Sequence, residues 1–249
     1  MIEFQQLTRS YGDFTAVKPL SLSVERGEMF GFLGPNGAGK TTTIRMMMGI
    51  LVPSGGRALI HGLDCHTERA QVQRHVGYLP DNPIYYDFLR GREILQFVAE
   101  MHGMPRDDAA RRTRELLAEF GLDDAVDEFA VNYSMGMKKK LGLACALIHD
   151  PQVLILDEPI NGLDPRAARE VQDRLRQAAA AGKTIFMSTH LLDMAEKVCT
   201  RVGIIHRGEL TATGTLQELR ERVNQNVSLE EVFLKLTDED VTTEGAAAS

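Results

Sequence analysis

A short glycine-rich segment constrains the fold of this chain more than any other feature. Residues 34–41 read Gly-Pro-Asn-Gly-Ala-Gly-Lys-Thr, with two glycines, a lysine and a threonine at the positions of a phosphate-binding loop. The apolar run Met29–Leu33 comes directly before it, and a helix is expected from Lys40 to about Gly49. A strand, a glycine-rich turn and a helix in this order are typical of an α/β nucleotide-binding fold.

The chemistry of this loop favours nucleotide phosphates. Glycines let several backbone N–H groups face one point, and the following helix start adds a partial positive charge. Lys40 is expected to reach the β- and γ-phosphates, and the Thr41 hydroxyl to ligate Mg²⁺. A chance glycine-rich turn would match in on the order of one chain in a hundred, and the motif alone names no particular enzyme. The predicted nucleotide contacts in this segment are Gly34, Pro35, Asn36, Gly37, Ala38, Gly39, Lys40, Thr41 and Thr42.

Two acidic residues follow a second apolar run. Asp157 and Glu158 come directly after Val153–Leu156, which predicts their place at the carboxyl end of a buried strand, where α/β folds bind ligands. Asp157 is suited to hold Mg²⁺ directly or through water, and Glu158 to orient and polarise an attacking water as general base. A strand that ends in two solvated acids is the alternative, and the loop upstream favours the catalytic interpretation.

The rest of the chain predicts strands and helices in alternation, which implies a mostly parallel sheet. Leu20, Leu22 and Val24 alternate with serines, as in a half-buried strand. Further strands are expected at Arg57–Ile60, Val76–Leu79, Val153–Leu156, Thr184–Met187 and Val202–Ile205. Helices are expected at Gly91–His102, Asp107–Phe120, Met135–His149, Arg166–Ala181 and Leu191–Cys199. Strand signals vanish from about residue 82 to 149, which predicts a helical insert between two strand-rich parts.

Composition limits the cellular location and the binding partners that are expected for this chain. The formal net charge is −7, which disfavours general binding to nucleic acid. The spacings of Cys65, Cys145 and Cys199 fit neither a disulfide framework nor a zinc site, so three reduced thiols are expected. The amino end shows no secretory signal, and no apolar run approaches the roughly 18 residues that a membrane span needs. A cytoplasmic protein is expected, and any membrane part would be another chain.

These motifs together resemble the ATP-binding-cassette ATPases, from about Ile2 to Leu236. Tyr11 stands where that family has an aromatic residue that stacks on adenine. The segment Tyr-Ser-Met-Gly-Met at 133–137 resembles the family signature, in which Ser134 and Gly136 contact the γ-phosphate bound by another subunit. The three lysines that follow at 138–140 are interpreted as a solvated basic face.

Two later segments continue the resemblance. Asn-Gly-Leu-Asp at 161–164 resembles the loop that communicates across the dimer, which makes Asp164 a candidate nucleotide-site residue. Ser-Thr-His at 188–190 resembles the switch in which His190 contacts the γ-phosphate. The implied fold is α/β, with a P-loop nucleotide-binding core, a mostly parallel sheet, an N-terminal antiparallel β subdomain and an inserted helical subdomain. A single domain at 1–236 would precede a disordered tail at 237–249.

The sequence departs from the family pattern at two places. The family has glutamine where Asp81 follows Pro80, so the role of this position is open, and Asp81 joins Thr41 and Asp157 as a candidate Mg²⁺ ligand. The signature has Met135 for glycine and a second methionine for glutamine. Contact with the γ-phosphate remains the expectation, with altered packing around the loop.

The resemblance implies a subunit that binds and hydrolyses ATP with Mg²⁺ to power a membrane transporter. Its expected partners are a separate transmembrane permease subunit and a second cassette, in a homodimer or a heterodimer, on the cytoplasmic face of the membrane. Stretches such as Gly77–Pro80 and Ser228–Phe233 look most like exporter-type subunits. The alternatives are a soluble cassette ATPase that acts on the ribosome or nucleic acid, and a hydrolysis-poor regulatory half of a heterodimer. The sequence does not reveal the transported substrate.

Overall fold

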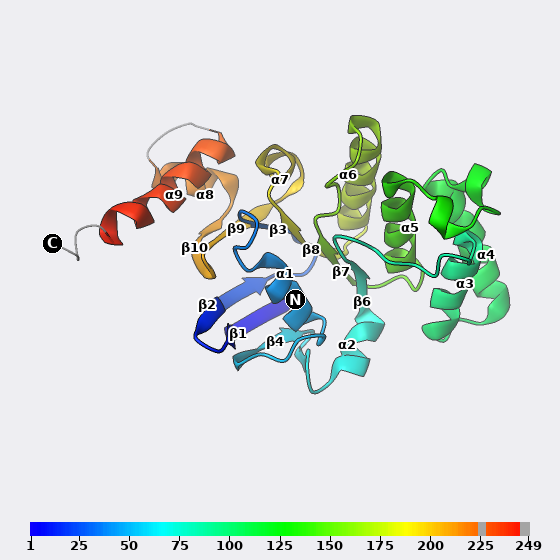
Figure 1. Ribbon diagram of the computed structural model, residues 1–249, viewed down its shortest axis with the longest axis horizontal. Helices are drawn as coiled ribbons and strands as arrows, with labels where there is room; N and C mark the ends of the chain where they lie inside the picture. Colours follow the sequence, from blue (N-terminus) through cyan, green and yellow to red (C-terminus); the bar gives the residue numbers. More distant parts are fainter. Residues whose placement is uncertain (224–227, 245–249) are drawn as a thin grey trace. The chain divides into compact units, whose positions relative to one another are not determined.

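The computed structural model describes residues 1–223 and 228–244, and the chain forms two compact units. Unit 1 consists of Met1–Arg69 and the chain from Phe186 onward, and unit 2 consists of Ala70–Ile185. Helix α2 (Arg69–His75) and strand β8 (Thr184–Thr189) carry the chain across the two boundaries (Figure 1).

Unit 1 begins with an antiparallel sheet of strand order β2-β1-β4-β5, drawn in blue to cyan in Figure 1. Ile2 of β1 pairs with Val24 of β2 on one side and with Ile60 of β4 on the other. Leu20, Leu22 and Val24 are buried and the serines between them are exposed, which confirms the predicted half-buried strand. The strands are β1 (Ile2–Tyr11), β2 (Phe14–Val24), β4 (Gly55–Ile60) and β5 (Leu63–Asp64).

A second set of strands in unit 1 positions the glycine-rich loop. Strand β3 (Met29–Leu33) lies parallel to β9 (Arg201–His206), which pairs antiparallel with β10 (Glu209–Gly214). Every residue of β3 is buried, as its apolar run predicts. Phe186 packs against three other rings, with centroid separations of 6.0, 5.7 and 5.4 Å, to form an aromatic core between the strands. The other three rings belong to Phe4, Phe30 and Phe32.

In its described residues, unit 1 also contains the helices α1 (Lys40–Met47), α7 (Leu192–Val198), α8 (Leu216–Arg222) and α9 (Leu229–Glu244). Helix α8 starts with a capping box, because the Thr215 hydroxyl accepts from the Glu218 N–H and the Glu218 carboxylate accepts from the Thr215 N–H. The backbone of α9 is helical to Glu244, where the sequence analysis expected a disordered tail from residue 237. Residues 245–249 lie outside the described part of the chain.

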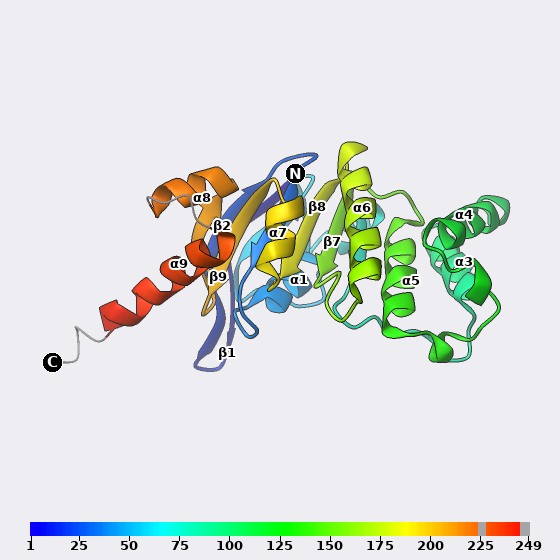
Figure 2. The same cartoon turned by 90° about the horizontal axis from the view of Figure 1, so that it is seen from above.

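Unit 2 holds a parallel strand pair and the helical insert. Strands β6 (Val76–Leu79) and β7 (Val153–Asp157) run parallel, with Val76 opposite Val153. The chain between them forms α3, α4, two short 3₁₀ turns and α5, and α6 follows β7. Figures 1 and 2 both show α3, α4 and α5 side by side, as expected for an inserted helical subdomain. The helices are α3 (Gly91–Met101), α4 (Arg106–Glu119), α5 (Met135–Leu147) and α6 (Pro165–Ala180), and the turns are Asp123–Ala125 and Ala130–Asn132.

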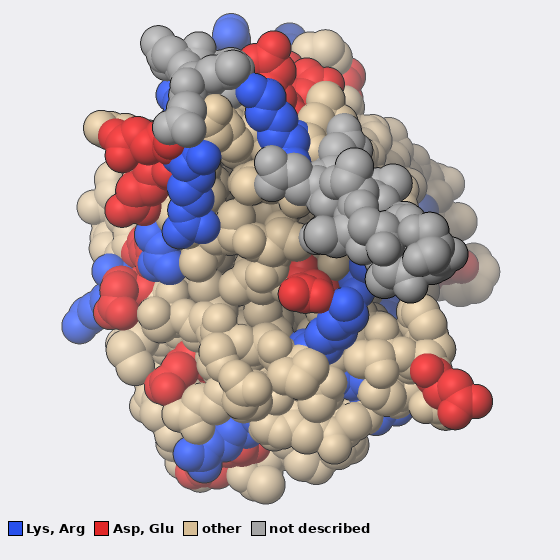
Figure 3. Space-filling view, turned by 90° about the vertical axis from the view of Figure 1, so that its left-hand side faces the viewer, with Lys and Arg blue, Asp and Glu red and all other residues tan. Residues whose placement is uncertain are grey.

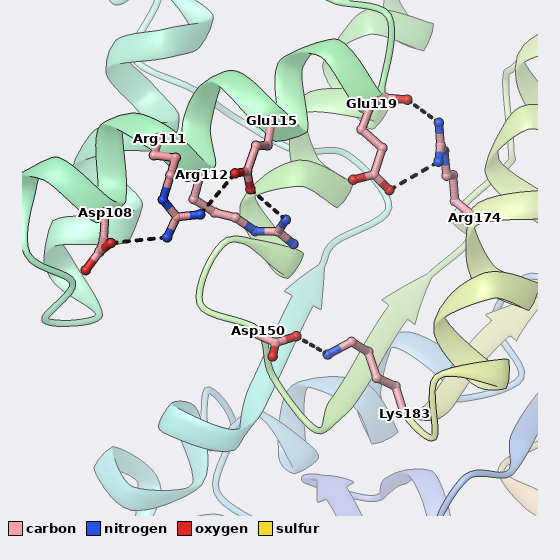
Figure 4. Close-up of polar contacts among 8 residues, drawn as sticks. All are labelled: Asp108, Arg111, Arg112, Glu115, Glu119, Asp150, Arg174 and Lys183. Atoms are coloured by element: carbon pink, nitrogen blue, oxygen red, sulfur yellow. Dashed lines mark hydrogen bonds and ion pairs between the residues drawn. The ribbon is translucent and has the colours of Figure 1, made fainter.

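Several ion pairs lie on the surface of unit 2, and one of them connects α6 to the end of α4 (Figure 4). Arg174 of α6 donates to the Glu119 carboxylate at 3.2 Å and to the Glu119 main-chain carbonyl at 2.5 Å. Arg111 pairs along α4 with Asp108 at 3.1 Å and with Glu115 at 3.0 Å. The pairs along α4 are exposed to solvent and contribute little, so the contact that Arg174 makes to a backbone carbonyl matters more for the position of α6.

Hydrophobic periodicity in the sequence did not predict strands β1 and β10 or helix α2. In β1 the period-two pattern breaks at Gln6, whose φ of 48° lies in the left-handed region and whose register with β2 shifts. Strand β10 also changes register, between Leu210 and Ala212. Irregular pairing of this kind moves side chains to the other face of a sheet and hides the strand from periodicity arguments.

Candidate functional site

The glycine-rich loop of unit 1 joins β3 to α1 with little room around its backbone. A Cβ atom at Gly34 would lie 2.3 Å from the carbonyl oxygen of Ile205. Gly39 has a φ of 107°, and a Cβ atom there would lie 2.7 Å from the carbonyl oxygen of Ala16. Neighbouring strands therefore press on the loop from both sides, and only glycine fits at these two positions.

Lys40 lies at the base of the loop with 5% of its surface exposed. Its ammonium donates to the carbonyl oxygen of Gly34 at 2.6 Å and to that of Pro35 at 3.2 Å. The following threonines, Thr41 and Thr42, are half-buried in the first turn of α1. A buried cation, a glycine-lined loop and a helix start fit an anionic phosphate chain, as the sequence predicts.

His190, at the end of β8, lines the same cavity as the loop. This cavity of about 330 Å³ joins two motifs that are far apart in the sequence. Its lining residues are Gly34, Pro35, Asn36, His190, Leu192 and Phe233. Phe233 was not predicted as a site residue, since its helix shows only an apolar periodicity. The structure thus brings the predicted histidine to the predicted phosphate loop within unit 1.

Tyr11, the candidate adenine-stacking residue, ends β1 with 47% of its surface exposed. The guanidinium of Arg9 lies over its ring, 4.5 Å from the ring centroid. The same Arg9 donates to the carbonyl oxygen of Val52 at 2.8 Å. An exposed aromatic ring that contacts a cation on one face is suited to stack against a flat base.

The acidic pair lies at the end of β7 in unit 2, at the carboxyl edge predicted from the sequence. Asp157 and Glu158 are both buried. Glu158 has a φ of 48°, a left-handed conformation that costs a non-glycine residue about 1–2 kcal/mol. Non-glycine residues in this region cluster at functional sites, because the surrounding structure must hold them there. The carboxylate of Glu158 is therefore presented from a constrained backbone.

Lys139 corrects the interpretation of residues 138–140 as a solvated basic face. Only 1% of its surface is exposed, and its ammonium donates to the main-chain carbonyl of Glu158. Burial lowers the pKa of Lys139, while the carboxylates of Asp81, Glu158 and Asp157 act in the opposite direction. A run of lysines carries no periodic signal, so nothing in the sequence distinguishes the buried residue from its neighbours.

Asp81 follows β6, and its carboxylate forms an ion pair with Lys139 at 3.5 Å. Its other oxygen accepts from the side-chain amide of Asn82 at 3.4 Å. Among the side chains that the structure describes, no group of three or more His, Cys, Asp and Glu could hold a metal ion.

The signature segment starts α5. The Ser134 hydroxyl accepts from the N–H of Met137 at 3.2 Å and so caps the helix. A Cβ atom at Gly136 would meet Leu163 at 3.7 Å, an ordinary contact, so packing inside this chain does not demand glycine there. Met135, which stands in place of a glycine, is half-exposed beside Gly162.

Asp164 caps α6 in the same way. One carboxylate oxygen accepts from the N–H groups of Arg166 and Ala167, each at 2.9 Å. The hydrogen bond from the Ala167 N–H is the largest contribution that holds the pKa of Asp164 below its usual range. This carboxylate stabilises the helix start within the chain, a role that stands beside the one implied by the resemblance.

Comparisons with known proteins agree on one family. A family model described as ABC transporter matches residues 17–161. The chain is 35% identical over 240 residues to the probable multidrug ABC transporter ATP-binding protein YbhF of Escherichia coli (strain K12), covering 95% of this chain and 41% of that protein. The chain therefore spans about two fifths of the length of that relative. In the part of this chain that the structure describes, no helix is long and apolar enough to cross a membrane.

Solved structures agree with the family model. An ATP-binding subunit of an ABC transporter superposes with a TM-score of 0.88 at 34% identity, over 95% of this chain and 99% of that one. A dimeric ATP-binding cassette, solved in a post-hydrolysis state with ADP and Pi, superposes with a TM-score of 0.80 at 20% identity, over 87% and 99%. At that lower identity the likeness shows the shared fold, including the antiparallel β region and the mixed sheet.

Proposed function

Since this chain belongs to the ABC transporter family, we propose that it binds and hydrolyses ATP as the ATP-binding subunit of a membrane transporter. The observation that carries the proposal is the cavity shared by the phosphate loop and His190, with buried Lys40 at the base of that loop. A glycine-lined loop that leads into a helix start is suited to triphosphate, and the histidine is suited to sense its last phosphate.

The binding step assigns a separate role to each group. Backbone N–H groups of residues 36–39 donate hydrogen bonds to the phosphates, and the ammonium of Lys40 offsets the charge of the β- and γ-phosphates. Tyr11, braced by Arg9, stacks on the adenine ring. Thr41 and Asp157 would hold the Mg²⁺ that accompanies the nucleotide, and as a Lewis acid the ion would offset charge on the phosphate oxygens.

Hydrolysis rests on Glu158 and His190. The Glu158 carboxylate orients and polarises the attacking water as general base, from the constrained backbone that follows β7. His190 contacts the γ-phosphate from the cavity that it shares with the loop. Phosphoryl transfer needs positioning and charge stabilisation more than covalent chemistry, and buried groups provide both.

The working form is a dimer of cassettes, either two copies or one copy with a related chain. Ser134 and Gly136 of one chain contact the γ-phosphate held by the loop of the other. The likeness to a cassette solved as a dimer with ADP and Pi supports this arrangement. Binding of ATP closes the dimer because the signature adds contacts only when the γ-phosphate is present, and hydrolysis removes them.

The partner in the membrane is a separate permease subunit, which places the chain on the cytoplasmic face. Unit 2 exposes large apolar side chains after β6 and along α3, and Ile84 alone is 93% exposed. The other exposed apolar side chains are Tyr86, Phe88, Phe97 and Met101. Tyr86, Phe88 and Phe97 line one pocket of unit 2, and exposed apolar side chains gathered in this way support contact with a protein partner. The multidrug description of YbhF supports an exporter.

The rival functions have less support. On the face of unit 1 shown in Figure 3, Lys and Arg side chains are interspersed with Asp and Glu side chains, and the net charge of −7 disfavours general binding to nucleic acid. A hydrolysis-poor regulatory subunit would lack one of the hydrolytic groups, whereas Lys40, Glu158 and His190 are all present.

Glu158→Gln tests the hydrolytic assignment. It keeps the shape of the side chain and removes the base, so kcat is expected to fall at least about a hundredfold while ATP still binds. Glu209→Gln, at an exposed ion pair with Lys18, is the matched control and is expected to keep wild-type activity. Equal ATPase rates in Glu158→Gln and wild type would contradict the assignment.

To identify the membrane partner, tagged Glu158→Gln protein is purified in the presence of ATP and Mg²⁺ from the membranes of the cells that naturally make the protein. A multi-span membrane protein is expected to copurify, and Phe88→Asp is expected to lose it while retaining ATP binding, since Phe88 belongs to the exposed apolar surface. Recovery of only soluble protein, ribosomes or nucleic acid would overturn the transport proposal and leave the ATP site intact.

A further inference from the structure

The side chain of Lys139 connects three elements of unit 2. It stands on α5 close after Ser134, and its ammonium contacts the Glu158 carbonyl beyond the end of β7 and the Asp81 carboxylate beyond the end of β6. At 1% exposure this is among the most deeply buried large side chains of the described chain. A buried ammonium is costly unless a countercharge and hydrogen-bond acceptors surround it, so this contact set is a built feature of the fold.

We propose that Lys139 is a positioning residue for the general base Glu158, and that Asp81 serves as its countercharge rather than as a Mg²⁺ ligand. The inference rests on the hydrolytic function proposed above. Lys139 acts through the main-chain carbonyl of Glu158.

The backbone of Glu158 explains why such an anchor is needed. Its left-handed φ of 48° is unfavourable for glutamate and persists only where contacts hold the peptide in place. The ammonium of Lys139 holds the carbonyl of that residue, and Asn161 donates its N–H to the same carbonyl at 3.2 Å. Two donors on one carbonyl fix the direction from which the carboxylate leaves the chain.

Asp81 completes the arrangement and accounts for a departure from the family pattern. Its side chain is 37% exposed, whereas the lysine that it pairs with is almost fully buried. A neutral glutamine at this position would not compensate the ammonium, while an aspartate does. The charge of Asp81 is therefore explained by Lys139 inside the same chain.

The anchor also couples α5 to the hydrolytic residue. Ser134 caps the helix that carries Lys139, so a shift of α5 along its axis moves the ammonium and, with it, the Glu158 carbonyl. A partner that engages the signature segment therefore acts on the geometry of the general base in the same chain. That coupling requires both the buried ammonium and its countercharge.

The test compares four variants by steady-state ATPase kinetics, ATP affinity and dependence on Mg²⁺. Lys139→Gln keeps a hydrogen-bond donor and loses the positive charge, and Asp81→Asn keeps an acceptor oxygen and loses the negative charge. The double variant removes both charges while leaving polar groups of similar shape. Lys138→Gln is the matched control, because Lys138 is the neighbouring lysine on α5 and is only half-buried.

Lys139→Gln is expected to lower kcat on the order of tenfold to a hundredfold with little change in ATP affinity, since a small displacement of a catalytic group has that effect. Asp81→Asn is expected to lower kcat without a change in the Mg²⁺ concentration for half-maximal activity. The double variant is expected to recover activity relative to Lys139→Gln, and Lys138→Gln to match wild type. Thermal unfolding of each variant separates loss of fold from loss of positioning.

Three results would overturn the inference. Wild-type kcat in folded Lys139→Gln would show that Glu158 needs no such anchor. A tenfold rise in the Mg²⁺ requirement of Asp81→Asn would make Asp81 a metal contact. Additive losses in the double variant would show that the two charges act separately. In each of these cases ATP hydrolysis by wild type stands, whereas absence of hydrolysis in wild type would instead defeat the proposed function.

Discussion

Lys40 and Lys139 are both buried, and both donate to main-chain carbonyls, yet they belong to very different environments. Lys40 contacts carbonyls five and six residues before it, within the loop that leads into its own helix. Lys139 contacts a carbonyl 19 residues away and a carboxylate on yet another segment. The first cation is held by a local turn, and the second by three elements that meet only in the folded chain.

This difference explains why one lysine is visible in the sequence and the other is not. A local turn leaves a fixed spacing of glycines beside the lysine, because backbone geometry demands them. A contact between distant elements leaves no spacing to recognise, and Lys139 stands between two other lysines. A buried charged residue at a functional site can therefore be recognised from a sequence motif when its partners are close in the chain. It cannot be recognised in this way when its partners are distant in the chain.

The largest effect should come from Lys40→Met, compared with Lys139→Met. Loss of the Lys40 ammonium is expected to lower ATPase activity by about a hundredfold or more and to weaken ATP binding, because we propose that this cation binds the β- and γ-phosphates. Lys139→Met is expected to lower kcat with ATP affinity nearly unchanged. Nucleotide titration and steady-state kinetics measure this split, with exposed Lys197→Met as the control. Equal losses of ATP affinity in both variants would erase the distinction between the two lysines.

A second comparison concerns Gly39 of the phosphate loop and Gly136 of the signature segment. Gly39→Ala places a methyl group 2.7 Å from a carbonyl oxygen at a φ of 107°, and is expected to lower the free energy of unfolding by about 2–4 kcal/mol. Gly136→Ala meets only an ordinary contact at 3.7 Å in α5, and is expected to be neutral or to stabilise by up to about 1 kcal/mol. Urea denaturation measures both. A similar loss at the two sites would show that the signature segment is as crowded as the phosphate loop.

The smallest effect concerns the two helix starts. Gly39 stands at the N-cap of α1, whereas the Ser134 hydroxyl caps α5. Ser134→Ala is expected to lower the free energy of unfolding by about 1 kcal/mol and to lower ATPase activity as well, through loss of the contact that we propose with the γ-phosphate held by a partner chain. Thr215→Ala, at the capped start of α8, should have a similar cost in stability with unchanged activity. An ATPase rate equal to wild type in Ser134→Ala would remove the signature contact from the mechanism.

Much of the fold could be read from the sequence, since its strands and helices carry regular periodicity. Two apolar runs predicted buried strands in a parallel α/β core. These strands are β3, which contains Phe30, and β7, which contains Leu154, and both lie where they were expected. The failures were irregular elements, such as β1 with its left-handed Gln6 and β10 with its register shift. Periodicity identifies regular segments, so it fails where the chain departs from regular geometry.

By itself the sequence predicted the phosphate loop and the acidic pair, because each is a run of neighbouring residues, and its motifs indicated the family by resemblance. The tertiary structure alone decided that Phe233 lines the cavity shared by the loop and His190, and that Lys139 is buried against Glu158 and Asp81. Burial and charge pairing depend on which surfaces pack together. Residues far apart in the chain acquire these properties only when the elements that carry them meet.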